Sequence, residues 1–300
     1  MTIPFAFVNE GSERKRMSNR FRSFTGSNNR PEKPRYVGVT EVRGPYYSAM
    51  GPHYLQEIFE AMGSYVDGVK FAGGSSSLMP KELIKGITEL AHSHGVYVSS
   101  GGWAEHNLVK GRGSFKQYVQ QCKELGFDTL ELSTGFLKLS DGDLLHLIRT
   151  AKSEGLKVKP ELGISFEPPD EIPVEDLSAQ NGPVTASLWP DEGKKDVDWL
   201  IKRAERWLEA GADMIMIDSE GLTKNVNPWR TDIIAKIIGR LGLDKTMFEA
   251  AEPRVFEWFI KNYGSTVNLF VDHSQIVQVE TFRSMIWDTR VSSGHFLRYI

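Results

Sequence analysis

The chain has 300 residues, of which 40% are hydrophobic, and its formal net charge at pH 7 is -3. A charge this close to zero argues against a general nucleic-acid-binding surface, and no apolar run approaches the length needed to cross a bilayer. Cys122 is the single cysteine, which excludes an internal disulfide and favours a reducing compartment. We therefore expect a cytoplasmic protein with one large core and with neither nucleic acid nor a membrane as a partner.

Both ends of the chain lack the pattern of a folded domain. Residues 1–33 are largely polar, and side chains such as Arg14, Lys15 and Arg16 make them basic. This composition is typical of a flexible tail, with a targeting or regulatory segment as the alternative. The regular pattern also fades after Phe282, so we expect a second tail at residues 286–300.

The body of the chain, residues 34–285, repeats one unit: an amphipathic helix, a glycine near its end, and a β-rich run. Glycine at this place is a common left-handed helix terminator. The repeat predicts eight strands, at Tyr36–Thr40, Val66–Phe71, Val96–Ser99, Thr129–Leu132, Lys157–Glu161, Met214–Asp218, Thr246–Glu249 and Val267–Leu269. Strands that alternate with helices pair in parallel, and eight such units across about 250 residues predict a single-domain (β/α)8 TIM barrel, an α/β fold.

One interval of the repeat is irregular. The segment from Gly163 to Lys195, between the fifth and sixth strands, carries five prolines: Pro168, Pro169, Pro173, Pro183 and Pro190. A segment of this length and composition does not continue the strand and helix pattern. We expect an insertion after strand five, on the face of the barrel where strands lead into helices.

A glycine- and serine-rich loop follows the second strand. Lys70 lies near the end of the strand, and Gly73 and Gly74 permit backbone conformations that other residues resist. Such a loop can aim several N–H groups at an anion where the dipole of the next helix already favours one. Lys70 and the Gly73–Ser77 loop therefore form a candidate anion site.

Four acids lie at the ends of four consecutive strands: Glu131, Glu161, Asp218 and Glu249. Side chains alternate along a strand, and the alternation places these acids on the inward face at the end that forms active sites in this fold. Converging carboxylates repel unless they are paired, protonated or bridged by a cation, and such oxygen ligands suit Mg²⁺. The alternative is a set of structural ion pairs with Lys70, Lys157 and Lys159.

Two segments hold weaker candidates. Glu105 or His106, after the third strand, is placed to reach the active face, although a capped helix start explains the segment equally well. Asp272 and His273 follow the eighth strand and resemble a catalytic pair. Adjacent residues of an extended segment face opposite ways, however, which argues against a joint role.

Longer phrases of the sequence resemble the phosphosulfolactate synthase family over nearly all of Pro34–Phe282. They are Asp67–Phe71 with its Gly/Ser loop, Glu124–Ser133, Ala210–Asp213, Phe248–Ala251, Trp258–Lys261 and Val267–Leu269. Within the family the chain is most similar to the plant heat-stress-associated branch. The phrases that carry this similarity are Val39–Pro45, Gly95–Ser99, Trp103–His106 and Val271–Ile276.

The resemblance implies a (β/α)8 barrel and, in the enzymatic branch, Mg²⁺-dependent addition of sulfite to phosphoenolpyruvate. It implies catalytic roles for Lys70, Glu131 and Glu161. It also implies substrate contacts from Gly74, Ser75, Ser76 and Asn268, and metal ligation by Glu161, Asp218 and Glu249. One of the acids would protonate the methylene carbon as sulfite attacks its neighbour. Because the enzymes of the family assemble, a homo-oligomer stays open as a further partner.

Two positions differ from the enzymes. Glu220 stands where the enzymes carry an arginine after strand six, and Phe270 stands where they carry a glycine after strand eight. A carboxylate repels anions that an arginine would bind, and a phenylalanine would crowd a phosphate.

These differences bear on the choice between functions. The resemblance implies a heat-stress protein that supports long-term acquired thermotolerance with a chaperone or disaggregase partner, and the two differences favour this hypothesis. The alternative is an active lyase that takes sulfite and phosphoenolpyruvate. A barrel that keeps Mg²⁺ and another small anion is a third hypothesis.

Overall fold

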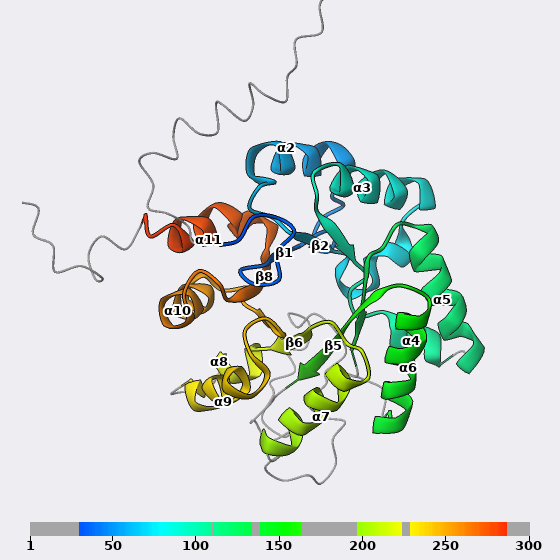
Figure 1. Cartoon of the computed structure of the whole chain (residues 1–300). Helices are drawn as coiled ribbons and strands as arrows, with labels where there is room; N and C mark the ends of the chain where they lie inside the picture. Colours follow the sequence, from blue (N-terminus) through cyan, green and yellow to red (C-terminus); the bar gives the residue numbers. More distant parts are fainter. Residues whose placement is uncertain (1–29, 110, 134–138, 164–196, 224–228, 287–300) are drawn as a thin grey trace, which may run out of the picture.

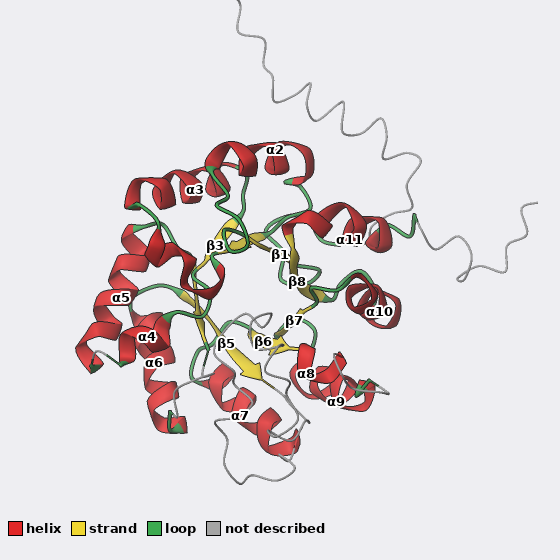
Figure 2. Ribbon diagram, turned by 180° about the vertical axis from the view of Figure 1, so that it is seen from behind, coloured by secondary structure: helices red, strands yellow, loops and turns green. Residues whose placement is uncertain are grey.

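A computed structural model describes residues 30–109, 111–133, 139–163, 197–223 and 229–286. Eight parallel strands of these residues close into a barrel, in which β1 pairs with both β2 and β8. Helices surround the strands, as Figures 1 and 2 show from opposite sides. The fold is therefore a (β/α)8 barrel, which confirms the fold class predicted from the repeat.

The strands are short, and each leads into a helical segment. They are β1 (Thr40–Arg43), β2 (Gly68–Lys70), β3 (Tyr97–Ser99), β4 (Thr129–Leu132), β5 (Lys157–Gly163), β6 (Ile215–Asp218), β7 (Thr246–Glu249) and β8 (Asn268–Asp272). The second to seventh strands lie where the repeat predicts them, with ends that shift by no more than two residues.

The prediction for the first strand was wrong in position. The sequence predicts it at Tyr36–Thr40, whereas β1 begins at Thr40 and ends at Arg43. Glu41 and Arg43 resemble loop residues because they are charged. Both side chains are nevertheless buried in the barrel, where Glu41 pairs with a lysine of β5 and Arg43 with a glutamate of β7.

The longer helices pack apolar stripes against the outside of the barrel. The helices are α2 (Pro52–Met62), α3 (Lys81–Ser93), α4 (Ala104–Leu108), α5 (Arg112–Glu124), α6 (Asp141–Ser153), α7 (Val197–Glu209), α8 (Glu220–Thr223), α9 (Thr231–Leu241), α10 (Pro253–Tyr263) and α11 (Ile276–Arg283). The 3-10 helices η1 (Ala72–Leu78) and η5 (His273–Gln275) follow β2 and β8.

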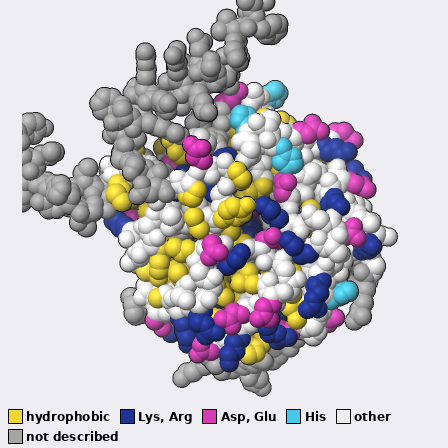
Figure 3. All heavy atoms as spheres, viewed as in Figure 1, with side chains coloured by type: hydrophobic (Ala, Val, Ile, Leu, Met, Phe, Trp, Pro, Cys, Tyr) yellow, Lys and Arg dark blue, Asp and Glu magenta, His cyan; other side chains and the backbone are white. Residues whose placement is uncertain are grey.

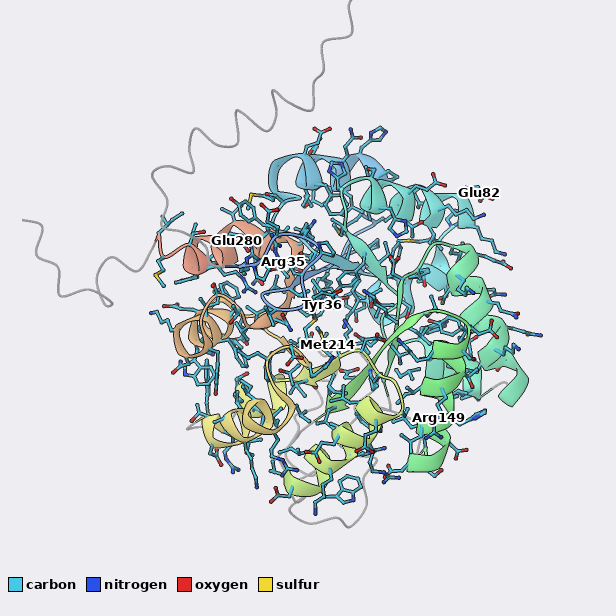
Figure 4. The ribbon with its side chains drawn as sticks, viewed as in Figure 1. Arg35, Tyr36, Glu82, Arg149, Met214 and Glu280 are labelled. Atoms are coloured by element: carbon cyan, nitrogen blue, oxygen red, sulfur yellow. The ribbon has the colours of Figure 1, made fainter. Side chains whose placement is uncertain are left out.

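Alternation along the strands produces two apolar layers. Outward side chains such as Val69, Leu130 and Ile217 belong to the main core, which lies between the strands and the helices. Inside the barrel is a smaller cluster of Val39, Met216, Met247 and Phe270, against which Tyr97 and Met214 pack. Figure 4 shows Met214 near the middle of the ring of helices, just before β6 begins.

Residues just before β1 pack against the end of the barrel where the strands begin. Arg30 pairs with Glu280 of α11 at 2.5 Å, and Arg35 pairs with Asp67 at 2.9 Å. Figure 4 shows Arg35 and Glu280 close together. Residues 30–33, which fall within the predicted tail, therefore belong structurally to the barrel.

Three predicted segments lie mainly outside the described residues: the amino-terminal tail (1–29), the insertion after β5 (164–196) and the carboxyl-terminal tail (287–300). Within the part of the chain that the structure describes, no helix is long and apolar enough to span a membrane. Figure 3 shows acidic and basic side chains interspersed along the rim of the face seen in Figure 1, with hydrophobic side chains nearer its middle.

Charged side chains also occupy the barrel interior. Lys159 of β5 forms an ion pair with Glu41 of β1, and the exposed fractions of the two side chains are 3% and 0%. Lys159 also lies 3.4 Å from a carboxylate oxygen of Glu131 of β4. Because a buried charge without a partner is strongly destabilising, these contacts join β1, β4 and β5 at the centre of the barrel.

We expect Lys159→Met to lower the free energy of unfolding by about 3–5 kcal/mol, because it leaves the Glu41 carboxylate buried without its lysine. The double variant Glu41→Leu/Lys159→Met removes both charges, so its free energy of unfolding should fall much less than that of Lys159→Met. Urea unfolding measures both changes. Lys116→Met is the matched control: Lys116 is 62% exposed in its pair with Glu154, and its loss should cost less than about 1 kcal/mol. Equal losses in the single and double variants would contradict this account.

Candidate functional site at the mouth of the barrel

The carboxyl ends of the strands bring predicted site residues together. We call this end the mouth and define it by its inward residues Arg43, Lys70, Glu131, Glu161, Asp218 and Glu249. They come from β1, β2, β4, β5, β6 and β7. Glu161 interacts electrostatically with Lys70, Glu131, Asp218 and Glu249, so the residues predicted as catalytic or metal-binding act on one another.

Lys70 is bound to a carboxylate. Its Nζ lies 2.9 and 2.8 Å from the two carboxylate oxygens of Glu131, and both side chains are buried. Burial alone would lower the pKa of Lys70, but Glu131 and other nearby acids outweigh it and raise the pKa above its usual value. Burial likewise disfavours the charged form of Glu131, and Lys70 and Lys159 outweigh it and hold its pKa below the usual value. Both members of the pair are therefore charged at neutral pH.

The alternative of structural ion pairs holds in part. Lys70 and Lys159 both pair with inward acids, whereas Lys157 at the start of β5 is exposed. The two paired lysines neutralise Glu131 and Glu41. They do not account for the other acids of the mouth.

Glu161 is an acid whose ionisation is strongly altered. It is half-buried near the carboxyl end of β5. Burial, followed by the carboxylate of Glu131, raises the pKa of Glu161 to about 8, and Asp218 and Glu249 add smaller contributions. Lys70 opposes the rise. A carboxyl group with this pKa carries a proton at neutral pH and can exchange it, as a general acid or base must.

The three predicted metal ligands are Glu161, Asp218 and Glu249. Their oxygens are donors of the kind that Mg²⁺ prefers. Their arrangement does not fit a ready-made ion site, because Glu249 pairs with Arg43 at 2.9 Å. Among the described residues, no group of three or more acidic, histidine or cysteine side chains is placed to hold a metal ion.

Arg43 is a mouth residue that the sequence analysis missed. It ends β1, is only 4% exposed, and lies 3.9 Å from Asp272 in addition to its contact with Glu249. A signal was present in the alternation of Thr40-Glu41-Val42-Arg43, which puts both charged residues on one face of a strand. The misplaced first strand concealed it.

The Gly/Ser loop forms η1, and its two glycines adopt φ of 54° and 73°. Aromatic rings lie against both glycines. A Cβ on Gly73 would lie 2.3 Å from the ring of Tyr46, and one on Gly74 would lie 2.1 Å from the ring of Trp103. The hydroxyl oxygen of Ser75 is buried and has no hydrogen-bond partner among the described residues. The glycines of the loop therefore make room for two rings, and the loop holds a buried hydroxyl that lacks a hydrogen-bond partner among the described residues.

Asn268 does not join the mouth. It begins β8, at the opposite end of the barrel. Its Oδ1 accepts a hydrogen bond from the backbone N–H of Val39 at 2.9 Å, and its Nδ2 donates to the carbonyl oxygens of Leu243 and Thr246 at 2.8 and 3.0 Å. These bonds join backbone segments where the strands begin, so the position fits a structural role rather than the expected substrate contact.

Phe270 lies within β8, because the strand continues to Asp272 rather than ending at Leu269 as predicted. Its buried ring lies 3.9 Å from the Nζ of Lys70 and 5.3 Å from the guanidinium carbon of Arg43. Phe270 therefore supports two cations from inside the barrel. The expectation that it follows strand eight was wrong.

The weaker candidates are placed as follows. His106 lies in α4 and stacks on Trp103, with ring centroids 3.9 Å apart. Asp272 caps η5, and its Oδ1 lies 3.4 Å from the Nδ1 of His273. These two neighbours therefore do meet, because the chain turns into a 3-10 helix after Asp272 instead of staying extended. The side chains of Glu105 and Glu220 lie outside the described residues.

The described part of the mouth thus combines two buried cations with a carboxyl group that is protonated at neutral pH, and the loop that follows β2 adds a buried hydroxyl without a hydrogen-bond partner among the described residues. These groups can bind a small anion and exchange a proton with it. The class that the fold and the site define is a (β/α)8 barrel protein with a cluster of charged side chains at the carboxyl ends of its strands.

The sequence matches the family (2R)-phospho-3-sulfolactate synthase (ComA) over residues 28–289, and the chain belongs to this family. It is 52% identical over 268 residues to Protein HEAT-STRESS-ASSOCIATED 32 of Arabidopsis thaliana, which covers 88% of this chain and 92% of that protein. It is 25% identical over 243 residues to phosphosulfolactate synthase of Methanocaldococcus jannaschii, a match that covers 77% of this chain and 86% of that protein. It is 27% identical over 261 residues to phosphosulfolactate synthase of Methanothermobacter thermautotrophicus, a match that covers 85% of this chain and 91% of that protein. The resemblance stated from the sequence is confirmed.

The raised pKa of Glu161 predicts how stability changes with pH. Between the ordinary value of 4.5 and about 8, the folded protein holds a proton that the unfolded chain has lost. Stability is therefore lost as pH rises through this window, at a rate of at most about 1.4 kcal/mol per pH unit from this group. Glu161→Gln should remove this contribution. Urea unfolding of both proteins from pH 5 to pH 8 tests it, and parallel curves would show that Glu161 is not the titrating group.

Proposed function

We propose that this protein is a heat-stress-associated barrel that supports long-term acquired thermotolerance in the cytoplasm, together with the chaperone and disaggregase system. The observation that carries the proposal is the 52% identity to the Arabidopsis heat-stress-associated protein, about twice the 25% and 27% to the two synthases. The identity extends over 88% of the chain, so it covers the barrel as a whole.

The proposal includes a small anionic ligand of the phosphoenolpyruvate class at the mouth. Ser75 supports this part, because a buried hydroxyl without a partner costs on the order of 1–3 kcal/mol that a bound anion would recover. The charges argue against a site that holds two anions at once. Lys70 is already paired with Glu131, and Arg43 with Glu249.

The proposed role predicts that the chain restores acquired thermotolerance to Arabidopsis plants that lack their heat-stress-associated 32 protein. Seedling survival is measured when a long recovery separates a mild priming treatment from a severe one. Lys70→Met/Glu131→Leu tests whether the mouth contributes, because the double variant removes a buried pair without leaving one charge alone. Survival no better than in plants without the transgene, with the protein present at normal abundance, would refute the role.

A lyase that adds sulfite to phosphoenolpyruvate is the second candidate, and Glu161 favours it. The name phospho-3-sulfolactate places the sulfo group on carbon 3 of the product. The sulfur of sulfite therefore attacks the methylene carbon of phosphoenolpyruvate, and the carbon that bears the phosphate takes a proton, which reverses the two positions expected from the sequence. A carboxyl group with a pKa of about 8, close to a buried lysine, is suited to donate that proton at neutral pH. Carbon–sulfur bond formation would then use Glu161 as the acid.

Turnover separates the two candidates. The purified chain is incubated with phosphoenolpyruvate, sulfite and Mg²⁺, and the sulfonate product is measured beside Glu161→Gln. The heat-stress proposal predicts no product above the level of the variant. Turnover that falls by about a hundredfold or more in Glu161→Gln, the usual size of a general-acid effect, would establish the lyase instead.

A further inference from the structure

Two cations lie next to each other at the mouth, on neighbouring strands. Arg43 of β1 is the register partner of Lys70 of β2, and the ring of Phe270 contacts both. The two cations differ in how firmly their counter-ions hold them. This difference indicates which cation an incoming anion can reach.

The counter-ion of Lys70 lies deep in the barrel. The side chain of Glu131 is 2% exposed, holds Lys70 with both oxygens, and contacts Lys159 as well. An anion that displaced Glu131 from Lys70 would leave the Glu131 carboxylate buried with Lys159 as its neighbour. It would also break both hydrogen bonds that Lys70 donates to Glu131. Lys70 is therefore a poor first contact for a ligand.

The counter-ions of Arg43 lie closer to solvent. Glu249 and Asp272 are each 16% exposed, and Asp272 is 3.9 Å away, beyond hydrogen-bond distance. Glu249 contacts the guanidinium through one amino group at 2.9 Å. The other amino group donates a hydrogen bond to the hydroxyl of Tyr47, and Tyr47 is 64% exposed. Displacing these partners returns a carboxylate and a hydroxyl toward water, where both are readily solvated.

Aromatic rings fix the guanidinium in place. The ring centroids of Tyr46, Tyr47 and Phe270 lie 5.9, 5.1 and 5.3 Å from its central carbon. Rings at these distances attract the cation and exclude water around it, which strengthens any charge–charge contact that it makes. A planar guanidinium that is held in this way can bind the two oxygens of a carboxylate or phosphate side by side.

We infer that Arg43 is the anion-binding residue of the mouth, and that Glu249 is an internal counter-ion which the carboxylate or phosphate of a ligand displaces. The inference rests on the proposed anionic ligand at the mouth. It gives Glu249 a role different from metal ligation. Ligand and Glu249 compete for one guanidinium, so removing the acid should strengthen anion binding instead of weakening it.

Calorimetric titration of phosphoenolpyruvate into the full chain tests the inference. The titrations are made at pH 6, where Glu161, with its pKa of about 8, stays protonated. Glu249→Gln is expected to bind about tenfold more tightly than the wild type, because the competing charge-assisted bond is gone. Arg43→Met is expected to bind at least about tenfold more weakly. Arg240→Met is the matched control, since Arg240 pairs with Glu205 at 2.6 Å on the outside of the barrel and should leave binding unchanged.

The double variant Arg43→Met/Glu249→Gln guards against a loss of fold. It removes both charges of the pair, so its unfolding midpoint should lie nearer to the wild type than that of Arg43→Met, while binding stays lost. Binding by the double variant as tight as by the wild type, or no gain in Glu249→Gln, would overturn the role of Arg43 and leave the proposed ligand in place. No binding by the wild type would overturn the ligand and this inference together.

Discussion

The barrel is organised around a buried series of alternating charges that runs from Lys70 through Glu131 and Lys159 to Glu41. These residues belong to β2, β4, β5 and β1, so the series crosses the inside of the barrel. Taking charges out of water is costly, and the cost is repaid only while each charge keeps its partner. Because this desolvation penalty falls as temperature rises, the buried series costs less at high temperature, which agrees with the proposed role in heat stress.

The same series determines what the mouth can do. It neutralises Glu131 with two lysines. Burial first, and then the carboxylate of Glu131 and the other acids nearby, raise the pKa of Glu161, so that Glu161 keeps a proton at neutral pH. Arg43 and Glu249 form a second, shallower pair beside it. The mouth therefore divides into a deep part that holds the strands together and an outer part whose charges can change partners. This division reconciles the two sequence-based hypotheses for the acids, because the structural ion pairs and the proposed ligand site occupy different depths of one barrel.

The fold could be predicted from the sequence because the repeat of helix, glycine and strand is local and regular, and alternation along β4 to β7 correctly placed Glu131, Glu161 and Glu249 at one end. Arg43 and Glu41 were missed because their partners, Glu249 and Lys159, are more than a hundred residues away, and a charged pair in a strand resembles a loop until such partners are known. Asn268 was expected near the mouth for a related reason. The phrase Val267–Leu269 does not reveal that β8 continues to Asp272, which places Asn268 at the start of the strand and far from the mouth.

The central claim is that the outer part of the mouth binds a small anion through Arg43. A crystal structure of the full chain with phosphoenolpyruvate tests this most directly. The account predicts a carboxylate or phosphate group of the ligand within hydrogen-bond distance of the Arg43 guanidinium, the hydroxyl of Ser75 donating to the ligand, and Glu249 turned away from Arg43 while Lys70 and Glu131 keep their contact. A ligand bound elsewhere, or one at the mouth with the Arg43–Glu249 pair intact, would contradict it.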